Sequence, residues 1–184
     1  FAYDSRNNSK AFAECAAEVL CYNGIKTFLF EEIMPTPVLS FSVRYLNCNA
    51  GIVITASHNP KEYNGYKVYD KYGCQLVPQY ADKVISYINN VKDIKSVKHV
   101  NLNMALSNGY LTYIGDEVLN SYISEVEKMA VYKEASDLKI VYTPLHGTGN
   151  IPVRKVLSDM SFDVSVDKEQ AVADGNFTTV RSPN

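Results

Sequence analysis

The stretch GIVITASHNPKEYNGYKVYDKYG, residues 51–73, decides how this sequence folds. It opens with a continuous run of apolar and β-branched residues, which is typical of a strand buried on both faces of a parallel sheet. A second strand-like run with a turn follows at residues 66–77, so we expect the chain to return beside the first strand. The loop between the two runs begins with Ser57 and His58, and it is either a simple turn or a place where chemistry happens.

The rest of the chain alternates strand-like and helix-like segments around this stretch. The first residues are expected to be the tail of a strand, and further strands are expected at residues 26–32, 51–57, 66–77 and 162–167 and at the start of segment 138–150. Helices are expected at residues 9–22, from 35 to near 49, and at 79–91, 116–132 and 151–160. In the first helix, one apolar face is formed at helical spacing by Phe12, Cys15, Ala16, Val19 and Leu20. The alternation predicts an α/β protein of layered α/β/α domains with a mixed, mainly parallel sheet: a first domain plus part of a second, similar one.

The pattern weakens between residues 92 and 111, where charged and polar residues increase. We interpret this segment as the end of the first domain and a connector. The predicted division is a first domain at residues 1–112, followed by a linker helix and a partial second domain at residues 113–184. In the second part, the Gly-rich loop around His146 lacks the lysine of a phosphate-binding P-loop, so a structural turn is favoured there.

Composition excludes several classes of function. The 184 residues are 46% hydrophobic with a net charge of −2, so a packed core is expected and the basic surplus of a nucleic-acid binder is missing. No apolar run approaches the roughly 20 residues that span a bilayer, and no secretory signal is visible. The cysteines, of which three lie in apolar runs, are expected to be buried reduced thiols; they are Cys15, Cys21, Cys48 and Cys74. This usage favours a reducing compartment, and the cytoplasm is the expected location.

Two interpretations of the loop after the buried strand stay open: Ser57 is a cap or turn serine with His58 as an exposed neighbour, or Ser57 belongs to a phosphoryl-transfer site. The loop leaves the carboxyl end of a strand, where open α/β sheets place their ligands. A hydrolase is less suitable, because the G-x-S-x-G elbow is absent and His58 is too close in sequence to act easily as the base of its neighbour. Phosphoryl transfer needs mainly positioning and positive charge, which Lys67, Arg6 and the loop amides could supply. Lys67 could also shuttle a proton.

These residues carry a resemblance to a known family. TASHNP at residues 55–60, followed by YNGYKVY at residues 63–69, resembles the phosphoserine loop of the α-D-phosphohexomutases, the family of phosphoglucomutase and phosphomannomutase. Further matches follow in the family's order along nearly the whole chain; they are YDSRNNS (3–9), PTP (35–37), PLHGTG (144–149) and DGNFTTVRSPN (174–184). The form of the loop is closer to phosphoglucomutase/phosphomannomutase members than to phosphoglucosamine mutases.

The resemblance implies a specific activity and a role for each site residue. Ser57 would carry a phosphate and donate it to a hexose 1-phosphate, and the hexose 1,6-bisphosphate so formed would return its other phosphate and leave as hexose 6-phosphate. Lys67 would exchange a proton with the sugar hydroxyl, Arg6 would help to hold phosphate, and His58 and Asn59 would shape the loop and contact phosphate. Mg²⁺ would bridge the phosphate of Ser57 and a set of aspartates.

The sequence also departs from the family pattern. Members have four domains, and the aspartate loop DGDADR, which supplies most metal ligands, is absent: Asp174 and Gly175 form the only Asp-Gly pair, without the following aspartate and arginine. The later sugar-discriminating and phosphate-clamping loops, and the segment that normally precedes Phe1, are missing too. We therefore interpret the chain as a piece of the enzyme that needs its C-terminal domains as partners and is expected to show no turnover alone.

Two other functions stay open at this point. The first is a non-catalytic sugar-phosphate-binding or regulatory protein that retains the loop, and the second is a serine hydrolase. A continuation of the natural gene into an aspartate loop would favour the mutase over the binding protein, and labelling by a fluorophosphonate probe would favour the hydrolase.

Overall fold

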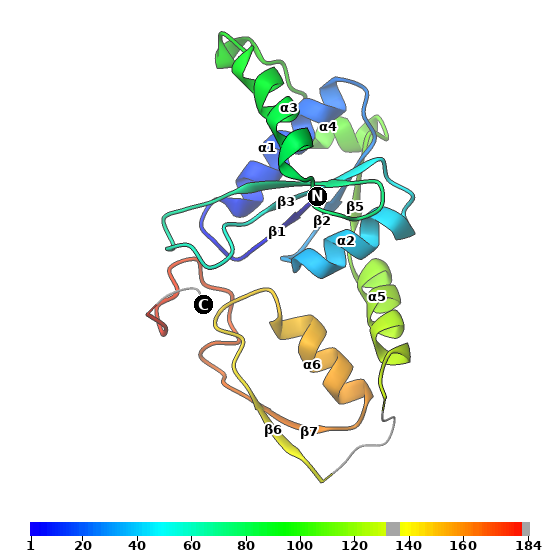
Figure 1. The fold of residues 1–184 in the computed structure, drawn as a ribbon, viewed down its shortest axis with the longest axis vertical. Coiled ribbons are helices and arrows are strands. Elements are labelled where there is room, and N and C mark those ends of the chain that lie inside the picture. Colours follow the sequence, from blue (N-terminus) through cyan, green and yellow to red (C-terminus); the bar gives the residue numbers. More distant parts are fainter. Residues whose placement is uncertain (132–136, 182–184) are drawn as a thin grey trace.

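The structure is a computed structural model, and it describes residues 1–131 and 137–181. Figure 1 shows a layered α/β body that contains the N-terminus, and below it a smaller unit that ends near the C-terminus. The strands are β1 (Ala2–Tyr3), β2 (Thr27–Phe30), β3 (Ala50–Ile54), β4 (Tyr66–Asp70), β5 (Leu111–Ile114), β6 (Lys139–Tyr142) and β7 (Asp163–Val166). The helices are α1 (Ser9–Tyr22), α2 (Thr36–Tyr45), α3 (Pro78–Asn89), the 3₁₀ turn η1 (Ile94–Ser96), α4 (Leu102–Ser107), α5 (Asp116–Lys128) and α6 (Asn150–Asp159).

The strands of the larger unit form a mixed sheet, as the sequence predicts. β1 and β3 run parallel, β2 and β5 run parallel, and β4 returns antiparallel to β3 after the Ser57 loop. Strand pairing gives a three-stranded sheet, β1-β3-β4, and a two-stranded sheet, β2-β5. The Phe30 N–H donates to the Phe1 carbonyl at 3.0 Å, so β2 lies beside β1 and the two sheets adjoin there.

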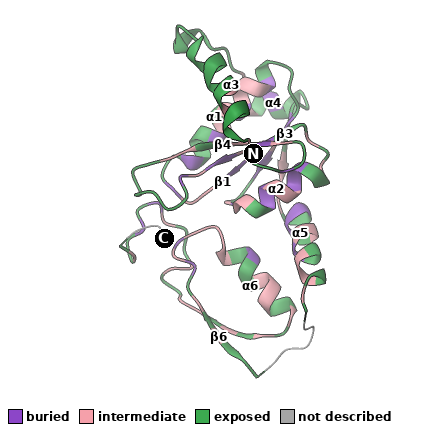
Figure 2. Ribbon diagram, viewed as in Figure 1, coloured by how far each residue is buried: buried purple, intermediate pink, exposed green. Residues whose placement is uncertain are grey.

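Alternate strand residues feed two hydrophobic clusters, one on each face of this sheet. Ala2, Phe30 and Val53 pack with α2 and α5, whereas their neighbours Tyr3, Leu29 and Ile54 pack with α1 and α4. This follows from the period of two in a strand, which sends successive side chains to opposite faces. The helices therefore cover both faces, and Figure 2 shows the buried residues gathered between them.

The smaller unit consists of β6, α6 and β7, with β6 and β7 parallel. Few of its described residues are buried; those that are include His146, Pro152 and Phe177. The division at residues 112 and 113 stays a prediction: β5 spans that point and pairs with β2, and α5 contributes Val118 and Leu119 to the core of the larger unit.

Several expectations about local structure are wrong in detail. The buried face of α1 is Ala13, Ala17 and Cys21 together with Ser9, while Phe12 is 50% exposed. Segment 92–111 is more than a connector, because it contains η1 and α4 and leads directly into β5. α2 ends at Tyr45, before the predicted end near Asn49, and residue 132, the predicted end of the helix that begins at residue 116, lies outside the described residues.

The cysteines are free, as expected, but only one of them is buried. Cys21 is buried, Cys48 is half-buried, and Cys15 and Cys74 are exposed. Cys15 is exposed because it lies on the face of α1 that points away from the sheet. No helix among residues 1–131 and 137–181 has the length and hydrophobicity needed to cross a membrane.

Candidate active site

The Ser57 loop and the segment that holds it meet because their strands are parallel neighbours. β1 ends at Tyr3, which pairs with Ile54 at the end of β3. Both strands therefore release the chain at the same edge of the sheet, where ligand sites of α/β folds are built. Residues 4–8 leave from one strand and residues 55–65 from the other, so Asp4 and Arg6 come to lie against the loop.

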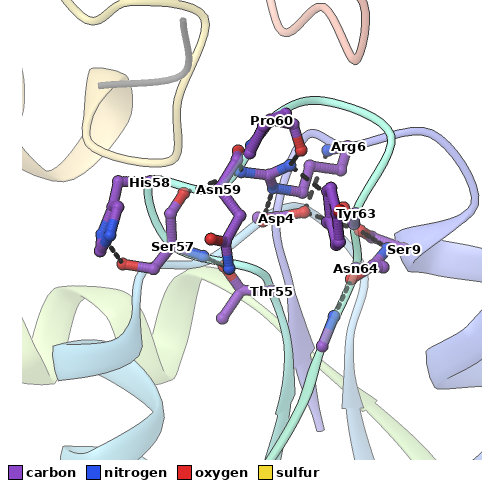
Figure 3. A network of polar contacts seen from close by, with 11 residues as sticks. Asp4, Arg6, Ser9, Thr55, Ser57, His58, Asn59, Pro60, Tyr63 and Asn64 are labelled. Atoms are coloured by element: carbon purple, nitrogen blue, oxygen red, sulfur yellow. Dashed lines mark hydrogen bonds and ion pairs between the residues drawn. The ribbon is translucent and has the colours of Figure 1, made fainter.

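Arg6 holds the loop by its backbone (Figure 3). Its side chain is almost fully buried, and Nη1 donates to the carbonyls of Pro60 (2.7 Å) and Tyr63 (3.1 Å). Nη2 donates to the carbonyls of Ser57 (2.9 Å) and Asn59 (2.6 Å). A planar guanidinium with five N–H groups suits this task, because four carbonyls on one curved loop face its two terminal nitrogens.

The fifth N–H of Arg6 faces a carboxylate. Asp4 Oδ2 lies 3.3 Å from Arg6 Nε, and Asp4 Oδ1 accepts hydrogen bonds from the Arg6 backbone N–H (3.0 Å) and the Ser9 hydroxyl (2.6 Å). Ser9 in turn accepts from Asn64 Nδ2 at 2.8 Å. The loop is thus held at both of its sides by one connected polar network that begins at Asp4.

Gly65 closes the loop where no other residue would fit. Its carbonyl accepts from the Thr55 N–H at 3.0 Å, so the two ends of the loop are hydrogen-bonded to each other. A Cβ at position 65 would lie 2.5 Å from the Thr55 carbonyl oxygen, well inside van der Waals contact. The Asn64-Gly65 pair is therefore fixed by sterics as well as by turn preference.

This frame presents Ser57 to solvent. Ser57 is exposed and adopts a left-handed backbone conformation with φ of 55°, which is unusual for a residue with a side chain. Its N–H donates to Thr55 Oγ1 at 3.2 Å, and its hydroxyl oxygen lies 3.4 Å from His58 Nδ1, a long contact. A strained residue held by its surroundings at the end of a strand is a common feature of functional sites.

The other predicted site residues are Asn59, His58 and Lys67, and they differ in what their atoms contact. The Asn59 backbone is engaged on both sides, since its N–H donates to the Ala56 carbonyl at 3.1 Å and its carbonyl accepts from Arg6. His58 is exposed beside Ser57. Lys67 is half-buried on β4 opposite Val53, and no hydrogen bond or ion pair engages its ammonium group within the part of the chain that the structure describes. Whether these side chains contact phosphate stays a prediction.

A hollow opens beside His58, between the Ser57 loop and the end of the smaller unit. Its lining combines basic, amide and hydroxyl side chains with few acids; the residues are His58, Pro60, Lys61, Glu62, Asn176, Phe177, Thr178, Val180 and Arg181. A second, more apolar hollow lies at the opposite edge of the sheet, where Thr27 and Ala50 begin their strands. The first is the candidate ligand pocket, because His58, the neighbour of Ser57, lines it and it lies at the carboxyl ends of the strands.

The turn that borders this hollow is organised by an acid. The Asp174 carboxylate accepts from the backbone N–H of Asn176 (2.8 Å) and from the N–H and hydroxyl of Thr178 (3.0 and 2.7 Å). These bonds, those from Thr178 foremost, stabilise the charged form and lower the pKa of Asp174 to about 2. The Asp174 carboxylate therefore stabilises the turn at residues 174–178.

The described residues do not fit a metal site. No three histidine, cysteine, aspartate or glutamate side chains gather anywhere in residues 1–131 and 137–181 in a way that would hold an ion. Asp4 is the acid closest in the chain to Arg6, and its two carboxylate oxygens already contact Arg6 and Ser9. A magnesium ion would need oxygen donors in addition to a phosphate on Ser57, so we derive no step through a metal.

The sequence predicts Ser57 and Arg6 as site residues, which stays a prediction, but three further residues of the polar network were not predicted. Asp4 contacts Arg6 and Ser9, and Ser9 accepts a hydrogen bond from Asn64, so all three belong to the frame. An aspartate two residues before the arginine, at the end of a strand, was the available signal. His146 is structural, as predicted: it is buried and accepts or donates through both ring nitrogens, at 2.8 Å from the Val172 carbonyl and 2.7 Å from Thr179 Oγ1.

Most of the chain matches the patterns of one known protein family. Residues 1–95 match the pattern of "Phosphoglucomutase/phosphomannomutase, alpha/beta/alpha domain I", and residues 120–184 match that of domain II. The chain belongs to the phosphoglucomutase/phosphomannomutase family. A phosphoglucomutase of Staphylococcus saprophyticus is 40% identical over 183 residues, which is 99% of this chain and 33% of that protein. This chain therefore spans about one third of the length of the curated relatives it matches.

Solved structures agree on the fold. The crystal structure of a protein described as a "putative phosphomannomutase" from Thermus thermophilus superposes with a TM-score of 0.78 at 22% identity, over 97% of this chain and 38% of the other. A phosphoglucomutase/phosphomannomutase family protein from Burkholderia thailandensis gives 0.65 at 19% identity, over 96% and 36%. At these identities the likeness supports the α/β fold and nothing more specific.

Proposed function

We propose that Ser57 is the phosphoryl carrier of a phosphohexomutase that interconverts hexose 1-phosphate and hexose 6-phosphate. The observation that carries this proposal is the loop itself: a buried arginine and a closed polar network hold an exposed, strained serine at the ligand edge of the sheet. Membership of the phosphoglucomutase/phosphomannomutase family supports the substrate class. Such a frame suits phosphoryl transfer, which depends chiefly on position and charge.

The proposed transfer is reversible and balanced. A sugar hydroxyl oxygen attacks the phosphorus of phosphorylated Ser57, a new P–O bond forms to the sugar, and the bond from phosphorus to Ser57 Oγ breaks. The sugar hydroxyl loses a proton and Ser57 Oγ regains one. Lys67 is proposed to exchange the proton, since its ammonium group has no partner among the described residues and lies on the strand that leaves the loop. Repetition at the other phosphate of hexose 1,6-bisphosphate completes the interconversion.

Arg6 is proposed to act on phosphate through the loop. All five of its N–H groups point at protein oxygens, so its main contribution would be the shape of the loop and a buried positive charge beneath it. His58 and Asn59 are proposed to contact the phosphate from the exposed side. Lys61 and Arg181 add positive charge to the hollow beside His58, which suits an anionic sugar phosphate.

The rest of the proposed activity rests on parts outside this chain. Two thirds of the curated relatives' length has no counterpart here, so we propose those regions as the source of sugar recognition and of magnesium ligands, and the cytoplasm as the location. The chain alone is expected to accept phosphate slowly from hexose 1,6-bisphosphate but not to sustain ordinary turnover, because no set of carboxylates for a metal gathers among its described residues.

Labelled hexose 1,6-bisphosphate tests the proposal. We expect this chain to take up about one phosphate per molecule, Ser57→Ala to take up none, and Ser86→Ala, which removes an exposed serine of α3, to match the unmodified chain. Equal labelling of Ser57→Ala would refute the carrier role. A fluorophosphonate that labels Ser57 would favour a hydrolase, and tight binding of the bisphosphate without transfer would favour a non-catalytic sugar-phosphate-binding protein.

A further inference from the structure

The end of the smaller unit docks directly onto the segment that holds the Ser57 loop. Asn7 Nδ2 donates to Asn176 Oδ1 at 3.0 Å, although the two residues lie 169 positions apart. A Cβ on Gly175 would lie 2.5 Å from Asn7 Oδ1 and 2.6 Å from the Asn7 backbone nitrogen, so the two backbones touch. Figure 1 shows this last segment, in red, beneath the connection between β3 and β4.

Phe177 is the centre of this contact. Its ring is buried, and its centroid lies 5.6 Å from Arg6 Cζ, within the range of a cation–π interaction. The ring covers the guanidinium on a side where water would otherwise compete for the N–H groups that bind the loop. Arg6 is itself only 4% exposed, so a charge with this little hydration depends on every favourable contact around it.

The smaller unit holds Phe177 in an unfavourable backbone conformation. Its φ is 52°, a left-handed value that is rare for a bulky residue and persists only where surrounding contacts determine it. The Phe177 N–H donates to the Asp174 carbonyl at 3.1 Å, and the His146 ring packs edge-on against Phe177 with centroids 6.4 Å apart. The Val172 carbonyl can only accept, so His146 Nδ1 donates to it and orients the imidazole ring.

We propose that Phe177 is a positioning residue that keeps the Ser57 loop in its phosphate-accepting shape through Arg6. The chain of contacts runs from His146 to Phe177, from Phe177 to Arg6, and from Arg6 to four carbonyls of the loop. The smaller unit thus contributes to the site without touching Ser57. The importance of Phe177 to the reaction rests on the proposed carrier role of Ser57. The effect of Phe177 on the shape of the loop does not, and it is tested separately.

Hydrogen exchange of residues 55–66 measures the shape of the loop without any substrate. Phe177→Leu keeps an apolar side chain and removes the π face, so exchange in the loop is expected to rise by roughly threefold to thirtyfold, the range of a partly desolvated cation–π contact. Phe177→Tyr keeps the ring and is expected to exchange like the unmodified chain. Phe162→Leu makes the same change in the hollow between α6 and β7, and it is expected to leave the loop unaltered.

A double-mutant cycle with Arg6→Gln, which removes the positive charge that faces the Phe177 ring, tests whether Phe177 acts through Arg6. If Phe177 acts through Arg6, then Phe177→Leu adds much less than its own effect once Arg6 has been replaced. Full additivity would overturn the proposal, as would loop exchange in Phe177→Leu that equals the unmodified chain. An equal rise in β3, β6 and the loop would also overturn it, because Phe177 would then be a general packing residue.

Uptake of phosphate from labelled hexose 1,6-bisphosphate supplies the functional readout. Phe177→Leu is expected to slow phosphorylation of Ser57 by a factor similar to its effect on exchange, and Phe177→Tyr is expected to restore the rate. If the unmodified chain takes no phosphate while Phe177→Leu still loosens the loop, the carrier role fails and the positioning of the loop stands. If uptake is normal and Phe177→Leu changes neither readout, the positioning role fails.

Discussion

Replacement of Arg6 by lysine should open the Ser57 loop while leaving the fold intact. Lysine keeps the positive charge beside Asp4 but offers one nitrogen in place of the planar fork that serves the carbonyls of Ser57, Asn59, Pro60 and Tyr63. One ammonium group can reach about two of these carbonyls, so about two charge-assisted hydrogen bonds are lost.

The size of the effect follows from those two bonds. Each hydrogen bond to a charged group contributes about 1.5–3 kcal/mol, and the exposed loop lets water replace part of the loss. We therefore expect the free energy of opening the loop to fall by about 1–3 kcal/mol, which accelerates amide exchange by roughly one to two orders of magnitude. The core clusters on the two faces of the sheet do not involve Arg6, so their exchange should change little.

Hydrogen exchange read by mass spectrometry on residues 55–66 gives the answer directly. Arg44→Lys is the matched control, because Arg44 is an exposed arginine near the end of α2 and should give loop exchange equal to the unmodified chain. Loop exchange within twofold of the unmodified chain in Arg6→Lys would refute the reasoning, since the carbonyl contacts would then contribute nothing to the loop.

Three further changes test other parts of the site. Gly65→Ala places a Cβ 2.5 Å from the Thr55 carbonyl oxygen, so unfolding in urea should show a loss of about 1–3 kcal/mol, and an unchanged midpoint would contradict the steric account. Acidification should open the Asp174 turn, because the lowered pKa of Asp174 stabilises the turn fully above pH 3.8 and this stabilisation is lost as the pH falls towards about 2. The NMR shift of the Thr178 amide reports the opening, and Asp174→Asn should show the open turn at neutral pH. Lys67→Met should slow phosphate exchange between chain and sugar by about two orders of magnitude with normal loop exchange, and an unchanged rate would exclude Lys67 as the proton carrier.

The layered fold could be predicted because its strands and most of its helices have clear periodicity. The buried face of α1 could not, since the pattern favours the large residue Phe12, whereas close packing on the sheet selects the small side chains of Ala13 and Ala17. β5 was missed for a related reason: residues 111–114 are a short run whose pairing with β2 is a contact between distant parts of the chain.

The position of the Ser57 loop could be predicted from the sequence, but the hydrogen bonds that hold the loop could not. Ser57 follows a buried strand, so its place at the ligand edge of the sheet follows from the sequence. Whether Arg6 faces phosphate or the backbone depends on where four loop carbonyls point, and local sequence does not contain that information. The contact between Arg6 and Phe177 joins the two ends of the chain, and only the folded arrangement reveals it.

The location of phosphate on the protein tests the central claim most directly. The chain would be incubated with hexose 1,6-bisphosphate and digested, and its serine-containing peptides, among them the one with residues 55–66, would be sequenced by fragmentation mass spectrometry. We expect a phosphate on Ser57 and none on the other serines. Phosphate on His58 or on scattered serines, with Ser57 bare, would contradict the claim.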